Sequence, residues 1–547
     1  MKIKLTFLFA ILLVTRTASS QPSPLWISSY NSATNGTEEM SAMTMDNSGN
    51  IYVTGRSIVT GTYYDYATVK YNSAGVQQWA VRYNNTASSY DGATCIAVDD
   101  SGNVYVGGYS DGSGTAYDYA TVKYNSAGVQ QWVQRYNGPG NYYDLLSDIK
   151  VDASGNVYVT GSSNASASSN TDFATIKYNS AGVQQWIQRY NGPGNSNDGA
   201  ASLAIDASGN VYVTGTSMAS SINGSEDIAT VKYNTSGVQQ WVARYNGSAN
   251  FEDYGRKVIV DAIGNVYVMG RSWTNNTNRL DYTTLKYNSS GVQQWVRTYN
   301  GPGNQDDLPY DIAVDASGNV YVTGGIITVS SGDDYFTIKY NSSGSQLWAA
   351  QFNGLGNGND DASSLIVDAA GNVYVTGTCM GSGTSFDWVT VKYNSSGTQQ
   401  WMKIYNGSAD YWDFANAIRL DAGGNIIVSG TSSGITSGSD YTTIKYSQVT
   451  GITPLNNEIP QHFSLSQNYP NPFNPGTKIR FELPMSSFVK LIVFDALGRE
   501  LETLVSENLS AGTYEQLWNA DKYSDGVYFY KLTAGNFSET KRMILVK

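Results

Sequence analysis

Histidine and cysteine are nearly absent from this chain of 547 residues, which contains one histidine and two cysteines. Zinc sites depend on clustered His and Cys ligands, and a nucleophilic serine or cysteine usually needs a histidine base, so the sequence argues against both kinds of site. His462 stands apart from the repeated region, and Cys95 and Cys379 occupy different places within their repeats. We therefore expect two free thiols.

Charged residues are also scarce, at 14% of the chain, and basic residues are outnumbered: 33 Lys and Arg against 45 Asp and Glu give a net charge of -12. A chain of this charge repels a phosphate backbone and an anionic membrane surface, so nucleic acid is not an expected partner. No cofactor is expected either.

Long apolar runs are missing except at the N-terminus, where Leu5 to Val14 follow Lys2 and Lys4. Ten apolar residues are too few to span a bilayer. The run is followed by small polar residues ending near Ser20, which is typical of a secretory signal peptide. We therefore predict that residues 1–20 are a signal peptide and that the mature chain has no transmembrane segment.

Glycine (56) and tyrosine (42) are abundant, a composition that favours many short strands and turns. The chain is also periodic. Eight Gly-Asn pairs follow one another at steps of 53 to 55 residues, beginning at Gly49, Gly102, Gly155, Gly209, Gly264, Gly318, Gly371 and Gly424. A tryptophan keeps the same spacing, at Trp26, Trp79, Trp132, Trp186, Trp241, Trp295, Trp348 and Trp401. The sequence is therefore an array of eight copies.

Each copy contains four short runs, which the third copy illustrates: residues 145–152, 156–161, 172–179 and 183–191. Apolar and polar residues alternate along them, as in half-buried strands, and the turn Asp152 to Gly155 suits a tight hairpin closed by a left-handed glycine. One four-stranded sheet cannot bury both faces alone, so neighbouring copies must stack on it. We predict an all-β, eight-bladed β-propeller over residues 21–450, in preference to a β-helix or a series of sandwiches.

The two ends of the array complement each other. It opens with a lone strand of the fourth type, residues 25–30, and closes with a lone strand of the third type, residues 440–447. We predict that the N-terminal strand completes the last blade and closes the ring without free edges.

The copies VDASGNVYVTG at residues 151–161 and DYATVKYNSAGVQQW at residues 118–132 resemble the SBBP family of bacterial β-propeller repeats, and their strand order is similar to that of NHL repeats. This resemblance implies the fold but no single activity and no catalytic residues. By analogy with NHL repeats, the first strand of each copy should lie innermost and the tryptophan strand outermost.

Composition changes after Tyr446. Residues 451–462, with Pro454 and Pro460, are predicted to be a linker, and residues 463–547 contain further short strands that fit a small Ig-like β-sandwich. This segment resembles the type A C-terminal sorting domain of type IX secretion cargo, in NYPNPFNP, VFDALGRE, AGTYEQLWN, DGVYFYKL and the ending TKRMILVK. The motif residues are Tyr469, Pro470, Asn471, Pro472, Phe473, Asn474, Pro475, Gly498, Gly512, Gly526, Tyr528 and Lys547.

The second resemblance implies a Gram-negative cell, recognition by the type IX secretion machinery and a protein that is secreted or held on the outer cell surface. Removal of the domain after export is common in such cargo.

Some residues recur in every copy. Lys177 and Asp172, five residues apart, have equivalents throughout, and we expect a structural ion pair within or between blades. At Gly161 a side chain is expected to intrude on the next blade. The adjacent carboxylates Asp306–Asp307 and Asp360–Asp361 are the candidates for glycoside cleavage, but neighbours on a loop do not fix the opposed geometry of acid and nucleophile. Loop carboxylates leave calcium binding open.

Three functions fit these observations: a non-catalytic surface binding or adhesion protein, which we favour, a polysaccharide-active enzyme, and a structural envelope component. The loops after the second and fourth strands vary between copies and should share one face of the propeller. Their aromatics suit a glycan or a protein ligand, although they could equally cap the blades. The candidate ligand-binding residues are Tyr143, Tyr254, Trp273, Arg279, Tyr411 and Trp412.

Overall fold

The structure is a computed structural model that describes residues 22 and 24–547, except 33–34, 59–62, 86–89, 113, 167–169, 221–223, 275–278, 329–331, 382–384, 436–437, 448–458, 510 and 521–522. The predicted signal peptide and most of the predicted linker fall outside the described residues. The chain divides into two compact units, one formed by Pro24–Ser447 and the other containing the C-terminal segment that follows it.

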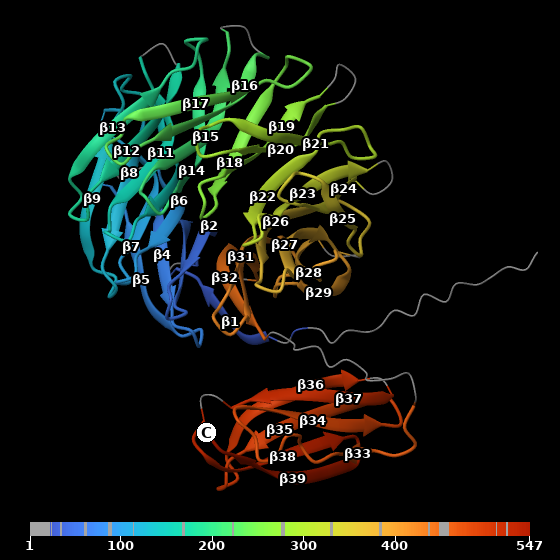
Figure 1. Cartoon of the computed structure of the whole chain (residues 1–547). Coiled ribbons are helices and arrows are strands. Elements are labelled where there is room, and N and C mark those ends of the chain that lie inside the picture. Colours follow the sequence, from blue (N-terminus) through green and yellow to red (C-terminus); the bar gives the residue numbers. More distant parts are fainter. Residues whose placement is uncertain are drawn as a thin grey trace, which may run out of the picture. The chain divides into compact units, whose positions relative to one another are not determined.

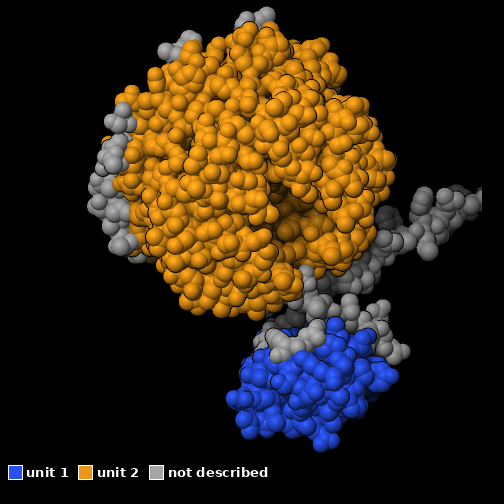
Figure 2. Space-filling view, turned by 60° about the vertical axis from the view of Figure 1, so that its left-hand side comes forward, with its two compact units in different colours: residues 1–23, 448–547 blue, residues 24–447 orange. Residues whose placement is uncertain are grey.

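Every regular element in the described part of the chain is a β-strand, and the larger unit consists of eight four-stranded antiparallel sheets. The first strand of each copy lies innermost and the tryptophan strand outermost, as the likeness to NHL repeats implied (Figure 1). Blade one is β2–β5, each of the next six blades takes the following four strands, and blade eight consists of β30, β31, β32 and β1. Figure 2 shows the surface of this unit, with a hollow near its centre.

The innermost strands are β2 (Glu38–Met45), β6 (Asp91–Val98), β10 (Asp144–Val151), β14 (Asp198–Ile205), β18 (Asp253–Val260), β22 (Leu308–Val314), β26 (Asp360–Val367) and β30 (Asp413–Leu420). The second strands are β3 (Ile51–Ile58), β7 (Val104–Asp111), β11 (Val157–Asn164), β15 (Val211–Met218), β19 (Val266–Trp273), β23 (Val320–Thr328), β27 (Val373–Met380) and β31 (Ile426–Gly434).

The third strands are β4 (Tyr64–Tyr71), β8 (Tyr117–Tyr124), β12 (Thr171–Tyr178), β16 (Glu226–Tyr233), β20 (Leu280–Tyr287), β24 (Gly332–Tyr340), β28 (Phe386–Tyr393) and β32 (Gly438–Tyr446). The outermost strands are β5 (Gln77–Tyr83), β9 (Gln130–Tyr136), β13 (Gln184–Tyr190), β17 (Gln239–Tyr245), β21 (Gln293–Tyr299), β25 (Gln346–Phe352), β29 (Gln399–Tyr405) and β1 (Pro24–Tyr30).

The N-terminal strand closes the ring, as predicted. It pairs antiparallel with β32, with Tyr30 opposite Tyr441, so that the last sheet has the order β1-β32-β31-β30. Strands of this last blade contact β2 of blade one. The eight-bladed architecture closed by the N-terminal strand is therefore confirmed.

The core of each blade is shared with its neighbour. Val157 and Val159 of β11 and Ala174 and Ile176 of β12 are fully buried, and they pack in one cluster with Tyr105 of the preceding blade. Burial of each larger apolar side chain contributes about 1.5–3 kcal/mol. A single blade lacks half of its core, which is why the copies fold as a ring.

A hydrogen-bonded turn joins the first two strands of each blade. In blade three the Gly155 N–H donates to the Asp152 carbonyl at 2.9 Å, and Gly155 has a φ of 76°, which favours glycine. The Asp152 carboxylate accepts hydrogen bonds from the backbone and side-chain amides of Asn156 and from the Tyr158 hydroxyl. The predicted hairpin turn is confirmed, and its aspartate is structural.

One backbone carbonyl fastens each blade to the one before it. The Ser180 carbonyl accepts a hydrogen bond from Trp132 Nε1 at 3.2 Å and another from Lys123 Nζ at 2.9 Å. The Trp132 ring also lies against Gly182, where an added Cβ would be 2.9 Å from it. The same tryptophan bond recurs from Trp26, Trp79, Trp186, Trp241, Trp295 and Trp348.

The predicted pairing of Asp172 with Lys177 is wrong. Asp172 forms a salt bridge with Arg189 at 2.9 Å, whereas Lys177 donates to the Thr235 carbonyl of the next blade and lies over the Tyr158 ring. Five residues along a strand span about 16 Å, so the two charges are at opposite ends of β12.

The expectation for Gly161 also needs correction. An added Cβ would lie 2.0 Å from the Leu145 carbonyl oxygen of the same blade and 2.8 Å from the Tyr119 hydroxyl of the preceding blade. The close approach is therefore not to the next blade. Cys95 and Cys379 are buried free thiols, as expected.

A buried acid begins, or directly precedes, each innermost strand. Asp144 Oδ2 accepts a hydrogen bond from the Gly138 N–H at 2.6 Å, and its Oδ1 accepts one from the Asn164 N–H, so it ties together two loops at the same end of the sheet. Burial raises the pKa of the aspartates of this set, to about 6 for Asp253 and Asp360 and to about 7 for Asp307. The equivalents are Glu38, Asp91, Asp198, Asp253, Asp307, Asp360 and Asp413.

The C-terminal unit contains two sheets around one core. A three-stranded sheet has the order β33-β34-β37 and a four-stranded sheet the order β36-β35-β38-β39. Phe481, Leu491 and Leu532 belong to one buried cluster that draws on both sheets. The strands are β33 (Ser464–Leu465), β34 (Gly476–Leu483), β35 (Ser487–Phe494), β36 (Glu500–Leu509), β37 (Gly512–Asn519), β38 (Gly526–Ala534) and β39 (Phe537–Leu545).

We predict that removal of β1 lowers the melting temperature. The deletion exposes an edge of β32 and removes backbone hydrogen bonds that contribute about 0.5–1.5 kcal/mol each, together with the Trp26 contact on blade one. Calorimetry on chains beginning at Pro24 and at Asn31 provides the comparison, with the longer chain as control. Equal melting temperatures would show that the ring does not depend on this strand.

We also predict a maximum of stability near about pH 4. The buried aspartates of this set have raised pKa values, so their stabilising contribution is fully present below their unfolded pKa of about 4 and is lost progressively as pH rises from there to 6 or 7. For the turn aspartates burial opposes ionisation, but hydrogen bonds from the following asparagine outweigh it and lower the pKa, so their contribution is lost on acidification below about pH 4. These are Asp46, Asp152, Asp206, Asp315 and Asp421.

Melting temperatures between pH 3 and 9 test this expectation. Asp307→Asn should reduce the loss of stability between pH 6 and 8, because it removes the carboxylate with the highest pKa that the structure assigns to this set. An unchanged slope in the variant would contradict the assignment.

Candidate functional site

The variable loops gather at one end of the blades. Antiparallel pairing places the near-constant turns after the first and third strands at one end, and the loops after the second and fourth strands at the other, which we call the variable face. The predicted ligand-binding residues occupy three separate blades of this face. Tyr143 belongs to blade three, Tyr254, Trp273 and Arg279 to blade five, and Tyr411 and Trp412 to blade eight.

The blade-five residues are largely engaged with their neighbours. Trp273 is half-buried and packs on Phe251, with ring centroids 5.3 Å apart. The Arg271 guanidinium lies 4.9 Å from the centroid of the Tyr254 ring, while Arg279 is exposed. In this group the aromatic rings cap the end of the blade.

Blade eight presents exposed aromatic rings. Tyr411 and Trp412 stack with centroids 4.9 Å apart and an interplanar angle of 18°, and they remain 53% and 49% exposed. Phe414 follows on β30 and is also exposed. Stacked rings that stay open to solvent provide a flat apolar surface that the fold has not used.

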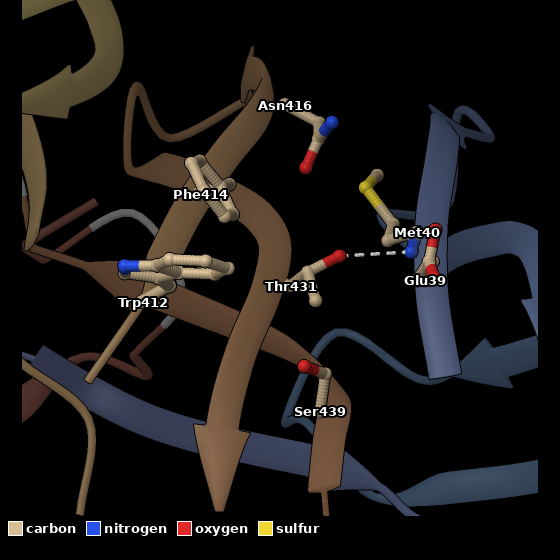
Figure 3. Close-up of a pocket in the computed structure, with 7 residues that line it drawn as sticks. All are labelled: Glu39, Met40, Trp412, Phe414, Asn416, Thr431 and Ser439. Carbon is tan, nitrogen blue, oxygen red and sulfur yellow. Dashed lines mark hydrogen bonds between the residues drawn. The ribbon is translucent and has the colours of Figure 1, made fainter. Parts of the chain in front are cut away.

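These rings border a cavity of about 370 Å³ between blades eight and one, which we call the seam cavity. In Figure 3, Trp412 and Phe414 stand on one side and β2 on the other. The Met40 N–H donates to Thr431 Oγ1 at 2.9 Å across the junction. The lining residues are Glu39, Met40, Trp412, Phe414, Asn416, Thr431 and Ser439.

Glu39 supplies the negative charge of the seam cavity, and its charge is compensated. It accepts hydrogen bonds from Arg56 Nε and from the Tyr64 hydroxyl, both at 2.9 Å. The cavity therefore combines aromatic walls with an amide, a hydroxyl and a paired carboxylate. Such a mixture holds a group that has an apolar face and polar edges.

The paired carboxylates proposed for glycoside cleavage hold loops instead. Asp307 and Asp360 are two of the buried inner-strand acids, and they accept hydrogen bonds from the backbone N–H of Gly301 and Gly354. Asp306 accepts one from the Leu280 N–H. In each pair one acid is buried and bonds the backbone, whereas the other, Asp306 or Asp361, is half-buried.

Metal and membrane features give little further guidance. Across the described ranges, the His, Cys, Asp and Glu side chains form no group of three or more that could hold a metal ion. Within the same part of the chain, no helix is long and apolar enough to cross a membrane.

Sequence reasoning missed a group of tyrosines on blades one to three. Tyr63, Tyr90 and Tyr117 lie on the variable face with Tyr143, and the rings of Tyr63 and Tyr90 touch, as do those of Tyr117 and Tyr143. The signal available in the sequence was an aromatic residue beside the start of the third strand in blades one and two. Only the structure shows that these aromatic residues lie close to residues of neighbouring blades.

The sorting motif of the C-terminal unit fastens the end of the chain. Phe473 is buried against Trp518, with ring centroids 5.5 Å apart, and its backbone exchanges hydrogen bonds with Ile544 and Val546. Asn471 Oδ1 accepts from the Ile544 N–H. Residues Asn468 to Pro475 therefore form a structural support for β39.

Other residues of the motif act in turns and at the last residue. Gly498 closes a turn with a φ of 77° by donating to the Asp495 carbonyl. The Tyr528 hydroxyl donates to the Ser524 carbonyl, and the Lys547 N–H donates to Asp525. Tyr469 is exposed, with a side-chain surface that the fold leaves open.

Comparison with known families matches two parts of the chain. Residues 467–547 match the secretion system C-terminal sorting domain, and residues 78–114 and 294–325 match the SBBP β-propeller repeat. A curated relative, an uncharacterized WD repeat-containing protein of Acanthamoeba polyphaga mimivirus, is 21% identical over 64% of this chain, and the match covers 34% of its own length. The chain thus spans about a third of that relative.

Two solved structures are similar to the chain at low identity. PorZ, described as an essential surface component of the type IX secretion system of Porphyromonas gingivalis, is similar over 93% of this chain and 70% of its own, with 12% identity and a TM-score of 0.32. The β-propeller domain of the trilobed protease from Pyrococcus furiosus covers 64% and 93%, with 9% identity and a TM-score of 0.38. Likeness at this level says nothing of function.

The sorting domain implies interaction with the secretion machinery and export, either to the cell surface or into the medium. The chain is thus built from SBBP-type β-propeller repeats and carries a type IX secretion sorting domain at its C-terminal end.

Proposed function

We propose that this exported propeller is a non-catalytic binding protein whose ligand, a glycan, occupies the seam cavity on the variable face. The observation that carries the proposal is the stacked pair Tyr411–Trp412, about half exposed beside a cavity of about 370 Å³. Contact between an exposed indole and water is unfavourable for the free protein. That free energy is recovered only when another flat apolar group covers the ring.

A sugar ring fits this chemistry better than an apolar ligand does. Its axial C–H face can lie on Trp412, and its hydroxyl groups can reach Asn416, Ser439 and the carboxylate of Glu39 at the edges of the cavity. Because the Arg56 guanidinium already neutralises Glu39 and the Tyr64 hydroxyl donates to it, the cavity does not require a cationic ligand.

The roles of the carboxylates support binding rather than hydrolysis. A retaining or inverting glycosidase needs two opposed carboxyl groups that flank the scissile bond. Asp307 and Asp360 accept hydrogen bonds from the backbone N–H of Gly301 and Gly354, and the seam cavity is lined by the single carboxylate of Glu39.

We propose for the C-terminal unit an Ig-like sandwich that serves as the export signal.

We expect Trp412→Ala to weaken glycan binding by about 2 kcal/mol, roughly a thirtyfold loss, because it removes the stacking surface. Glycan arrays with residues 21–547 would find the ligand, and calorimetry would measure the affinity. The melting temperature should change little, since the ring is half exposed.

Trp273→Ala is the matched control. Its indole lies on the same face but packs on Phe251, so the substitution should lower the melting temperature and leave the affinity unchanged. The proposal fails if Trp412→Ala binds the ligand as tightly as the wild type, or if the ligand is turned over.

Export through the sorting domain makes a separate expectation. Deletion of residues 463–547 should hold the propeller inside the outer membrane, and Phe473→Ala should reduce export because it removes the buried ring that supports β39. Cell fractionation with an antibody against the propeller measures both. Undiminished appearance outside the outer membrane after the deletion would refute this role.

A further inference from the structure

Seven tyrosines of blades one to three form a row on the variable face, in two groups of touching rings: Tyr63, Tyr64 and Tyr90, and Tyr109, Tyr117, Tyr142 and Tyr143. Their ring contacts run from blade one to blade three, with centroids 4.6 Å apart for Tyr63–Tyr90, 4.9 Å for Tyr109–Tyr117, 5.5 Å for Tyr117–Tyr143 and 4.4 Å for Tyr142–Tyr143. We call this row the tyrosine platform: Tyr63, Tyr64, Tyr90, Tyr109, Tyr117, Tyr142 and Tyr143.

The two groups meet on blade two. The Asp111 N–H donates to the Tyr90 carbonyl at 3.1 Å, so the backbone of Tyr90 lies beside the end of β7, the strand that carries Tyr109. Each ring carries a hydroxyl group, so the platform offers hydrogen-bonding groups on flat rings.

The fold makes room for the platform at one glycine. The innermost strand of blade two has Gly92 where its neighbours carry Glu39 and Leu145, and an added Cβ would lie 2.6 Å from the Tyr109 ring. Tyr109 thus rests on the backbone of β6. Arg56 lies 4.5 Å from the centroid of the Tyr64 ring and bonds Glu39, which fixes the blade-one end.

The rings of the platform are more exposed than packing requires. Tyr63, Tyr90, Tyr142 and Tyr143 are between 42% and 52% exposed, and they touch in two pairs, Tyr63 with Tyr90 and Tyr142 with Tyr143. A contiguous exposed aromatic strip is uncommon on a soluble surface and marks a site of interaction. Tyrosine suits that use, because it offers a large rigid surface at a low cost in conformational entropy.

The platform adjoins the seam cavity. Glu39 lines that cavity and accepts a hydrogen bond from the Tyr64 hydroxyl at 2.9 Å, so one residue belongs to the edge of both. Aromatic rings therefore lie on both sides of Glu39, with Trp412 and Phe414 of blade eight on one side and the platform on the other.

We propose that the tyrosine platform binds an extended, neutral polysaccharide whose chain continues out of the seam cavity across blades one to three. The inference rests on the proposed function, and it adds the ligand's length and charge. Exposed rings that follow one another over neighbouring blades match a polymer whose units present alternating apolar faces and hydroxyl edges. The net charge of -12 disfavours an acidic polymer, and the basic group at the platform, Arg56, is already paired.

The test compares polymer with oligomer. Residues 21–547 would be titrated with mixed-linkage β-glucan, mannan and xylan, with tetrasaccharides cut from each, and with alginate as the acidic comparison. The double variant Tyr90→Ala/Tyr143→Ala should weaken binding of the preferred neutral polymer by about tenfold or more and leave its tetrasaccharide within about twofold. Alginate should bind weakly to both proteins.

Two further variants guard against misreading. Tyr469→Ala removes an exposed tyrosine of the C-terminal unit and should leave every affinity unchanged. Tyr90→Phe/Tyr143→Phe keeps the aromatic rings, so it should retain the fold and most of the affinity. If the alanine variant loses stability, the phenylalanine variant tests the platform in its place.

The outcomes separate the two proposals. If Trp412→Ala weakens the tetrasaccharide but the tyrosine variants bind the polymer normally, the platform is refuted and the seam site stands. Equal affinity of polymer and tetrasaccharide in the wild type also refutes the platform. So does tight binding of a protein that the tyrosine variants lose, in place of polysaccharide.

Discussion

The contact between one blade and the next is the interaction on which this protein depends. A single carbonyl, such as that of Ser180, accepts hydrogen bonds from a tryptophan and a lysine of the preceding blade, while the indole lies flat on a glycine two residues further on. The contact needs an indole, a long cation and a residue without a side chain at fixed positions. That need explains why these residues return in every copy, and why the loops of the opposite face are free to vary.

Repetition made the fold predictable. Eight copies compared within one chain show which positions serve every blade, so strand number, turns, blade order and ring closure all followed from the sequence. The pairing of Asp172 with Lys177 was wrong because recurrence shows that a residue is needed but not what it touches. Arg189, on the adjacent strand, is the partner of Asp172, and strand register decides this.

The candidate site was less predictable for a related reason. Sequence variation located the variable face, and it picked out Trp412 and Tyr143, but it also picked out Trp273, which packs on Phe251. Exposure separates these residues, and exposure depends on neighbours contributed by other blades. The other tyrosines of the platform escaped notice because the contacts that join its blades, Tyr63 with Tyr90 and Tyr117 with Tyr143, link loops that are more than twenty residues apart in the sequence.

Strand β1 has a consequence for how the protein reaches its native state. Its partner β32 lies more than four hundred residues further along the chain, as the hydrogen bond between Ser29 and Thr442 illustrates. Contacts of such high sequence separation form late and slowly. Until β32 is synthesised and folds, one side of the first blade is uncovered and β1 has no partner strand. Such an unpaired strand is a template for association with other chains. A cell that exports this protein must therefore protect an open arc of blades for the whole interval between the emergence of the first strand and the closing of the ring.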